Sequence, residues 1–236
     1  SERPRFLTLY FSDVDNGAHQ HGPEPSPELA DALRAVDAAV AALVSGLDER
    51  GLGSRVDLMI VSDHGMSSTS AERVVFLDDY IDVETANVVD WNPVLALWPG
   101  EDKTDEIYSA LEGAHPHMAV YRGDEVPERY EFAGHERIAP IIGIADDGWS
   151  ISSTEFFESC PQCFDGGTHG YDHRLPSMGA LLIAYGPSFR AGARIGPIEN
   201  IHLYNVMCAV LGIEPASNSG DPSRVGELIR SEASMR

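Results

Sequence analysis

Hydrophobic and polar positions alternate along the chain in blocks whose lengths fit strands and helices. Apolar runs at 6–11 and 56–61 have the length of core strands. Between them, apolar residues recur at steps of three and four, which marks one buried helical face. Its members are Leu29, Leu33, Val36, Val40, Leu43 and Leu47. Ser26 followed by Pro27 supplies a capping hydroxyl and a proline at the first helical position. This order predicts a βαβ unit with two parallel strands.

The remaining apolar blocks extend an α/β pattern to the end of the chain. Further strands are expected within 92–100, 117–123, 137–148 and 178–189. Short helices are expected within 104–113 and 199–212, the second closed by Gly212. The predicted fold class is therefore α/β, a mostly parallel central sheet flanked by helices. The β-α-β pattern at about 84–147 predicts a small inserted α+β lobe.

Composition and charge narrow the classes of function. The chain has 236 residues, 43% of them hydrophobic, which suits one large domain with a sizeable core. No run approaches the roughly 18 apolar residues of a membrane span. The net charge is −22, with 38 acidic residues against 16 basic ones, which disfavours a nucleic-acid-binding surface. A phosphate substrate would need a local positive charge at its site, because the overall negative charge of the protein repels it.

The three cysteines do not define a metal site. Cys160 and Cys163 form the stretch C-P-Q-C, and Cys208 stands alone. One CxxC pair cannot complete a tetrahedral zinc site without a second pair. We expect either a local disulfide or two inert thiols at 160 and 163.

Three polar groups lie at or after the predicted strands. Asp15 and His19 follow the first strand in a polar loop, Asp63 and His64 directly follow the second, and His169 lies in the stretch GGTHGYDH. In open parallel sheets, ligands bind beyond the carboxyl ends of the strands. Each group alone is typical of a solvated loop, but the three together indicate a shared metal site. Carboxylate and imidazole without thiolate suit zinc and also tolerate manganese or iron.

Five stretches resemble consecutive motifs of the nucleotide pyrophosphatase/phosphodiesterase family, part of the alkaline phosphatase superfamily. They are LYFSDVDNGAHQHGP, IVSDHGM, THGYDHRLPSM, YGPSF and ENIHLYNVMCAVLGIEPASNSG. Their order and spacing, from Leu9 to about Gly220, are family-like. The resemblance implies an alkaline-phosphatase-like fold and hydrolysis of phosphodiester or pyrophosphate bonds in nucleotide-type substrates. It also implies two Zn²⁺ ions.

The resemblance carries over residue by residue to the three polar groups. Asp15, His19 and His169 match the ligands of one zinc, and Asp63 and His64 match two ligands of the other. The loop sequence V-D-N-G-A-H departs from the frequent P-D-S-S-G-H but keeps the step of four from aspartate to histidine. Two ions about 4 Å apart concentrate enough positive charge to bind phosphate on an acidic protein.

Tyr10 matches an aromatic position that borders the nucleotide pocket in similar bacterial enzymes. Its ring could stack on a nucleobase, with a core aromatic in a strand as the alternative. The implied partner is a nucleotide or another small phosphodiester, and the implied location is extracellular or periplasmic. The first residues, SERPRFLTLYF, lack the pattern of a signal peptide.

The family's nucleophile, a threonine, precedes the LYF strand, as does a further aspartate of the second zinc site. Thr8 lies in an apolar run typical of a buried strand, and Thr69 does not match the nucleophile's motif. We therefore expect residues 1–236 to be the carboxy-terminal portion of one catalytic domain, with the nucleophile upstream of residue 1. An amino-terminal fragment would complete the site, and the sheet would expose an apolar edge toward it.

Two other functions stay open at this point. One is a phosphomonoesterase or phosphomutase of the same superfamily, where D-H-G motifs also occur. The other is a metal-binding fragment that is catalytically incomplete.

Overall fold

The computed structural model describes residues 4–230, and contacts within the chain divide it into two compact units. The first unit combines the segments up to residue 12, 34–63 and from residue 180 onward. The second combines 13–33 with 64–179. Within the described residues, no helix combines the length and apolarity needed to cross a membrane.

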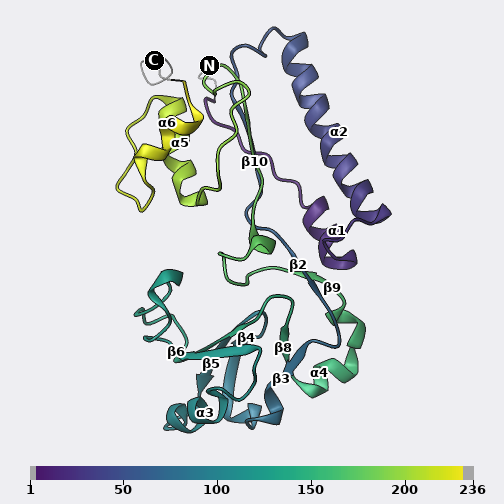
Figure 1. Cartoon of the computed structure of the whole chain (residues 1–236), viewed down its shortest axis with the longest axis vertical. Helices are drawn as coiled ribbons and strands as arrows, with labels where there is room; N and C mark the ends of the chain where they lie inside the picture. The colour runs from purple at the N-terminus through teal and green to yellow at the C-terminus, as the bar shows by residue number, and fades with distance from the viewer. Residues whose placement is uncertain (1–3, 231–236) are drawn as a thin grey trace. The chain divides into compact units, whose positions relative to one another are not determined.

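The first unit contains a short sheet and a small helical cluster. Strand β1 (Leu58–Val61) pairs antiparallel with β10 (Leu182–Tyr185). Helix α5 (Leu203–Leu211) lies beside the short α6 (Val225–Leu228), at the yellow end of the chain in Figure 1. Gly212 ends α5 with φ 66°, a left-handed conformation that glycine adopts at little cost. The strands predicted within 56–61 and 178–189 and the helix predicted within 199–212 are therefore confirmed as elements.

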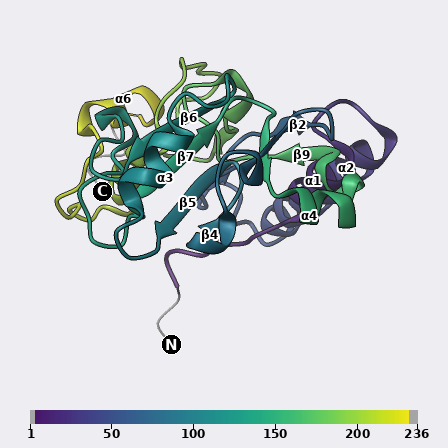
Figure 2. The same ribbon diagram turned by 90° about the horizontal axis from the view of Figure 1, so that it is seen from below.

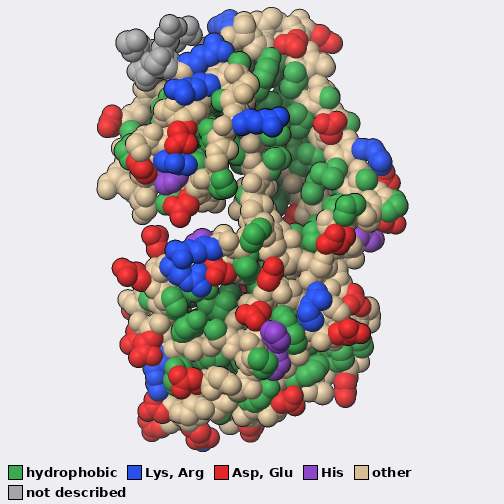
Figure 3. Space-filling model, viewed as in Figure 1, with side chains coloured by type: hydrophobic (Ala, Val, Ile, Leu, Met, Phe, Trp, Pro, Cys, Tyr) green, Lys and Arg blue, Asp and Glu red, His purple; other side chains and the backbone are tan. Residues whose placement is uncertain are grey.

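Helix α2 (Pro27–Glu49) begins where the sequence predicts. The Leu29 backbone N–H donates to Ser26 Oγ at 3.1 Å, so the expected cap is formed. The expected burial of its apolar face is wrong, because Leu29 is the one buried residue of the helix and Leu33 is 52% exposed. Apolar side chains are visible on the surface along this helix in Figure 3.

In the second unit, four strands form the largest sheet. The order is β4 (Ala86–Asp90), β5 (Val94–Pro99), β7 (Ile141–Ala145) and β6 (Met118–Arg122), and all neighbours are antiparallel. Helix α3 (Thr104–Leu111) lies against this sheet in Figure 2 and buries Ile107 and Leu111 in its core. These elements match the predicted β-α-β pattern. The contacts group them with the rest of the second unit, and their status as an inserted lobe stays a prediction.

Two short strand pairs and one short helix complete the second unit. Strand β2 (Ser67–Thr69) pairs antiparallel with β9 (Gly166–Thr168), and β3 (Val74–Phe76) pairs parallel with β8 (Ser150–Ser152). Helix α4 (Thr154–Ser159) follows β8. Short 3-10 helices of this unit lie at Leu77–Asp79, Val83–Thr85, Glu128–Tyr130, Pro161–Phe164 and Pro176–Met178, and those of the first unit lie at Asn200–His202 and Pro222–Arg224.

The expected mostly parallel central sheet is wrong for the described residues. Only β3 and β8 pair in parallel, and the other paired strands are antiparallel. The segment 6–11 forms no strand, and its apolar side chains are exposed, Tyr10 by 78%. A strand needs a neighbour for its backbone N–H and C=O groups, and an apolar run does not specify that neighbour. The expected βαβ unit is therefore absent from residues 4–230, although helices and strands do alternate.

Candidate metal centre

Asp15 and His19 lie on a helix and not in the expected polar loop. Helix α1 (Asp13–His21) places them one turn apart on the same face, with His19 Nε2 3.5 Å from Asp15 Oδ1. The sequence Asn16–Gly17 favours a turn, but it lies inside the helix. Gly17 faces α2 so closely that an added Cβ would lie 3.3 Å from Ala32 Cβ. Packing between the two helices therefore overrides the local turn preference.

Two glycines allow α1 to lie directly against β9. An added Cβ would lie 2.2 Å from the His19 carbonyl oxygen at Gly166, and 2.6 Å from the Ala18 carbonyl oxygen at Gly167. Gly166 also has φ +131°, which L-residues rarely adopt. His19 Nδ1 donates to the Gly167 carbonyl oxygen at 2.8 Å. This bond fixes the tautomer and leaves Nε2 as the basic nitrogen on the side of Asp15.

The pairing of β2 with β9 brings His64 and His169 together. His64 precedes β2, His169 follows β9, and Ser67 lies opposite Thr168 in the antiparallel register. The two imidazole rings stack at 3.5 Å between centroids with an interplanar angle of 14°. His64 Nδ1 donates to the Gly65 carbonyl oxygen at 2.8 Å, which orients this ring as well.

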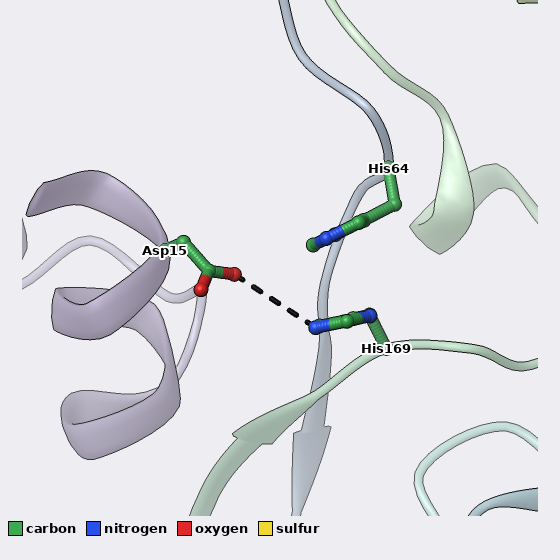
Figure 4. A group of neighbouring side chains, drawn as sticks. All are labelled: Asp15, His64 and His169. Atoms are coloured by element: carbon green, nitrogen blue, oxygen red, sulfur yellow. Dashed lines mark ion pairs between the residues drawn. The ribbon is translucent and has the colours of Figure 1, made fainter. Parts of the chain in front are cut away.

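Asp15, His64 and His169 converge on one point. Each offers one potential ligand atom, and these atoms lie within 4.8 Å of one another. Figure 4 shows the Asp15 carboxylate pointing from α1 toward the two rings, with its Oδ1 3.9 Å from His169 Nε2. Oδ1 is buried and accepts no hydrogen bond within residues 4–230. A buried carboxylate oxygen without a donor is costly. A cation held by carboxylate and imidazole would supply the missing interaction, so the residues fit a zinc ion.

The second unit contains four of the five predicted ligands, Asp15, His19, His64 and His169. Asp63 directly precedes His64 in the chain but belongs to the first unit, as does Tyr10. The sequence groups His64 with Asp63, whereas the structure places the His64 ring against His169. The assignment of each residue to one of two ions therefore stays a prediction.

The loop after His169 is held by two side chains that sequence reasoning did not single out. Tyr171 is buried and its hydroxyl donates to the Trp149 carbonyl oxygen at 2.9 Å. Burial raises the pKa of Tyr171 well above its usual range, so the hydroxyl stays a donor at neutral pH. Asp172 accepts from Arg129 Nη1 at 2.6 Å. Their sequence signal was their position inside the THGYDH motif, next to a predicted ligand.

The pKa of Asp172 lies below its ordinary value. Burial acts in the opposite direction, because it disfavours the charged carboxylate. The backbone N–H of Arg174, at 3.0 Å, and the Arg129 guanidinium more than offset this effect. Asp172 is therefore ionised at neutral pH and anchors the loop to Arg129.

The predicted cysteine alternatives are resolved as well. Cys160 and Cys163 form a disulfide between α4 and the following 3-10 helix, and Cys208 is a buried free thiol. None of the three is part of the Asp15, His64 and His169 group.

Comparison with known proteins points to one family. The family described as type I phosphodiesterase / nucleotide pyrophosphatase matches residues 1–172. Bis(5′-adenosyl)-triphosphatase ENPP4 of Homo sapiens is 37% identical over 215 residues, which cover 91% of this chain and 46% of the relative. Ectonucleotide pyrophosphatase/phosphodiesterase family member 5 of Homo sapiens is 36% identical over 223 residues, covering 94% and 46%. The chain spans about half the length of these relatives.

Solved structures of family member 5 share the fold of this chain. The human structure superposes with a TM-score of 0.88 at 36% identity and covers 94% of this chain and 58% of that chain. A murine structure, described as an inactive threonine-to-alanine variant in complex with AMP, has a TM-score of 0.85 at 35% identity. It covers 92% of this chain and 56% of that chain.

Proposed function

This chain belongs to the type I phosphodiesterase / nucleotide pyrophosphatase family, and from this premise we propose that its site takes part in zinc-dependent hydrolysis of phosphodiester or pyrophosphate bonds. The observation that carries the proposal is the convergence of Asp15, His64 and His169 around a buried carboxylate oxygen without a hydrogen bond. The names of the relatives support nucleotide-type substrates, since one is a bis(5′-adenosyl)-triphosphatase and another was solved with AMP.

Two Zn²⁺ ions are proposed, following the family pattern. Asp15, His19 and His169 would hold one ion, and Asp63 and His64 would contribute to the other. When bound, the ions supply a concentrated positive charge that lowers the pKa of a hydroxyl nucleophile and stabilises the phosphate oxygens. That local charge would allow an anionic substrate to bind a protein of net charge −22.

The chain's own residues orient this site. The bond from His19 Nδ1 to the Gly167 carbonyl fixes the ring's orientation and directs Nε2 toward Asp15. Among the described residues, no N–H group donates a hydrogen bond to Asp15 Oδ1, so this oxygen is available to a metal ion. The loop that begins at His169 is anchored by the hydrogen bonds of Tyr171 and Asp172, and His169 itself directly follows β9.

The nucleophile is proposed to be a threonine outside this sequence, in the position that family members place before the LYF motif. Thr69 lies in β2, paired with Gly166, and does not match that motif. Thr8 is exposed, so the expectation that it lies in a buried strand was wrong, but it does not match the motif either. The amino-terminal portion of the domain would supply this threonine and a further aspartate.

That amino-terminal portion is also a proposed partner for the exposed apolar surface of the first unit. Side chains on both strands of its small sheet are about half exposed, among them Val61 at 50%, Ile183 at 49% and Tyr185 at 58%. The exposed apolar side chains of this strand pair favour association with a further part of the domain.

Tyr10 is proposed to border the substrate's nucleotide. Its side chain is 78% exposed, so the ring is available for stacking and is not the core aromatic that was the alternative. An extracellular or periplasmic location is proposed from the names of the ectonucleotide pyrophosphatases and from the Cys160–Cys163 disulfide, which persists in oxidising compartments.

Metal content and turnover of the purified protein test this function. We expect two equivalents of zinc in the native protein. His169→Ala should lower zinc affinity by more than tenfold, because three protein ligands of one ion become two, and should lower hydrolysis in parallel. His173→Ala, a half-exposed histidine four residues further on, is the matched control. Unchanged zinc stoichiometry and turnover in the His169 variant would contradict the proposal.

The choice of substrate separates the proposal from the phosphomonoesterase alternative. A phosphodiesterase should turn over bis-p-nitrophenyl phosphate faster than p-nitrophenyl phosphate. The opposite preference would favour the phosphomonoesterase. Zinc binding without turnover of either compound would favour the metal-binding fragment.

A further inference from the structure

Asp147 joins two segments of the second unit through its carboxylate. One oxygen accepts the hydroxyl of Ser67, the first residue of β2, and the other accepts the hydroxyl of Ser177 at 3.0 Å. Ser67 is 5% exposed, so its hydroxyl is shielded from water and Asp147 supplies its acceptor. An ionised carboxylate suits this task, because it only accepts hydrogen bonds and offers two oxygens.

The backbone of the first segment contacts the short 3-10 helix that contains Ser177. The Met66 N–H donates to the Ser177 carbonyl oxygen at 2.8 Å, and the Gly65 N–H donates to the Met178 carbonyl oxygen at 3.1 Å. An added Cβ at Gly65 would lie 2.0 Å from the Ser177 carbonyl oxygen, so the two backbones are in direct contact. Asp147 therefore links two side chains at a point where the backbones already meet.

The position of the His64 ring depends on this linked segment. His64 directly precedes it, and its Nδ1 donates to the Gly65 carbonyl oxygen at 2.8 Å. The ring lies over that of His169 at 3.5 Å between centroids (Figure 4). A shift of the backbone at 65–67 would therefore move the His64 imidazole relative to His169 and Asp15.

We propose that Asp147 is a positioning residue of the candidate metal centre. Through Ser67 and Ser177 it fixes the backbone that follows His64, and it thereby holds the His64 imidazole over that of His169. Its effect on zinc rests on the proposed function, but the geometry of the two rings is measurable without metal.

The fold should survive the loss of this carboxylate. Strand β2 stays paired with β9 through its backbone. Arg73 also joins β2 to the turn after Asp147, because its Nη2 donates to the Ser68 carbonyl oxygen at 2.7 Å and its Nε to the Gly148 carbonyl oxygen at 3.0 Å. Asp147→Ala should therefore loosen the turn at His64 and leave the second unit folded.

The chain offers matched variants for this test. Asp146→Ala removes the neighbouring exposed carboxylate, which pairs with His117 Nδ1 at 2.9 Å, and is the control for the change in charge. Asp147→Asn is the rescue variant, because its amide oxygen can accept one serine hydroxyl and its N–H₂ group can donate to the other. Ser67→Ala removes the same hydrogen bond from its other end and should reproduce the effect of Asp147→Ala.

The ring geometry is measured by NMR on the whole purified protein, with ¹³C-labelled histidine and in EDTA. The ring C–H resonances of His64 are identified by their absence in His64→Gln. Stacked rings shift each other's resonances, so the native protein, Asp146→Ala and Asp147→Asn should share one shifted His64 position. Asp147→Ala and Ser67→Ala should move it toward the position of the half-exposed His173.

Zinc affinity, measured by competition with a chelating dye, should fall in the same two variants. We expect a loss of about tenfold, the lower end of the roughly 10–100-fold range for residues that orient metal ligands. Asp146→Ala and Asp147→Asn should keep the native affinity.

Two results would overturn the proposal. One is an unchanged His64 resonance in both Asp147→Ala and Ser67→Ala, and the other is an equal change in Asp146→Ala, which would trace the effect to charge. If Asp147→Ala does not fold, Ser67→Ala decides, because it keeps the bond between Asp147 and Ser177. If the native protein binds no zinc, the proposed hydrolysis fails, while the ring measurement still decides the role of Asp147.

Discussion

Replacing Gly166 by alanine should push apart helix α1 and strand β9, which position most of the proposed zinc ligands. Gly166 begins β9, which leads to His169, and it lies against the end of α1, which carries Asp15 and His19. The added methyl group would lie 2.2 Å from the His19 carbonyl oxygen. That atom belongs to the backbone of a helix and cannot rotate away.

The expected loss in the free energy of unfolding has two parts. The contact is more than 1 Å inside the roughly 3.5 Å separation of packed atoms, and overpacking of this kind costs about 1–3 kcal/mol. The backbone angle φ of +131° is sparsely populated for L-residues and adds about 1–3 kcal/mol. Gly166→Ala should therefore destabilise the second unit by about 2–6 kcal/mol and lower zinc affinity by at least tenfold, because α1 must move relative to β9.

Gly134→Ala provides the matched control. Gly134 also lies in the second unit and has φ +70°, but no atom of residues 4–230 lies within 4 Å of an added Cβ. It should cost about 1–2 kcal/mol, the penalty of a left-handed L-residue, and leave zinc affinity unchanged. All three tryptophans of the chain lie in the second unit, so fluorescence during urea unfolding reports the stability of that unit. Zinc affinity is measured separately by competition with a chelating dye.

The refuting result is specific. If the two variants lose equal stability and both keep native zinc affinity, the contact between Gly166 and His19 does not position the ligands. A loss of stability in Gly166→Ala with unchanged zinc affinity would show that the ligands find their places without close packing of α1 on β9.

Three further predictions follow from single contacts. Ser26→Ala removes the cap on the Leu29 N–H and should cost about 1 kcal/mol, seen as faster hydrogen exchange in the first turn of α2. Asp172→Asn should flatten the dependence of the free energy of unfolding on pH below about 4. The pKa of Asp172 in the folded protein lies below the unfolded value of about 3.9. The ionised carboxylate therefore stabilises the fold above that pH, and this stabilisation is lost as pH falls through the folded pKa. The asparagine amide of this variant can still accept a hydrogen bond in the loop but cannot form the ion pair with Arg129. Urea unfolding midpoints at pH 3 and pH 6 measure the change in stability. Tyr10→Ala should weaken binding of nucleoside 5′-monophosphates and spare a small aryl phosphodiester, and equal losses on both would indicate a folding defect.

Elements with strong local signals could be predicted from the sequence. Helix α2 has a cap, a proline and a long apolar period, and α5 has a glycine in the left-handed conformation at its end. The apolar runs that became β5, β6 and β7 were also recognised. In each case the deciding interactions lie within the segment itself, so the sequence of the segment is sufficient.

Elements whose signal is weak or nonlocal could not be predicted. Strands β2 and β9 consist of serine, threonine and glycine, and neither shows the alternation of a half-buried strand. Helix α1 contains Asn16–Gly17, a local turn signal that packing against α2 overrides. The direction of the strands could not be predicted either, because pairing depends on contacts between separate segments, which for β1 and β10 lie more than 100 residues apart.

Three of the five predicted ligand residues lie together in the structure although the sheet around them was not predicted, and the geometry explains this difference. The three converging side chains depend on α1 and on the β2–β9 pair, which lie in one unit and contact one another closely. This arrangement does not require a parallel sheet or a strand at 6–11. Motif spacing along the chain therefore predicted the chemistry of the group, an acid and imidazoles without thiolate, while the expected scaffold was wrong. The centre depends instead on glycines at 166 and 167, whose missing side chains let a helix and a strand meet.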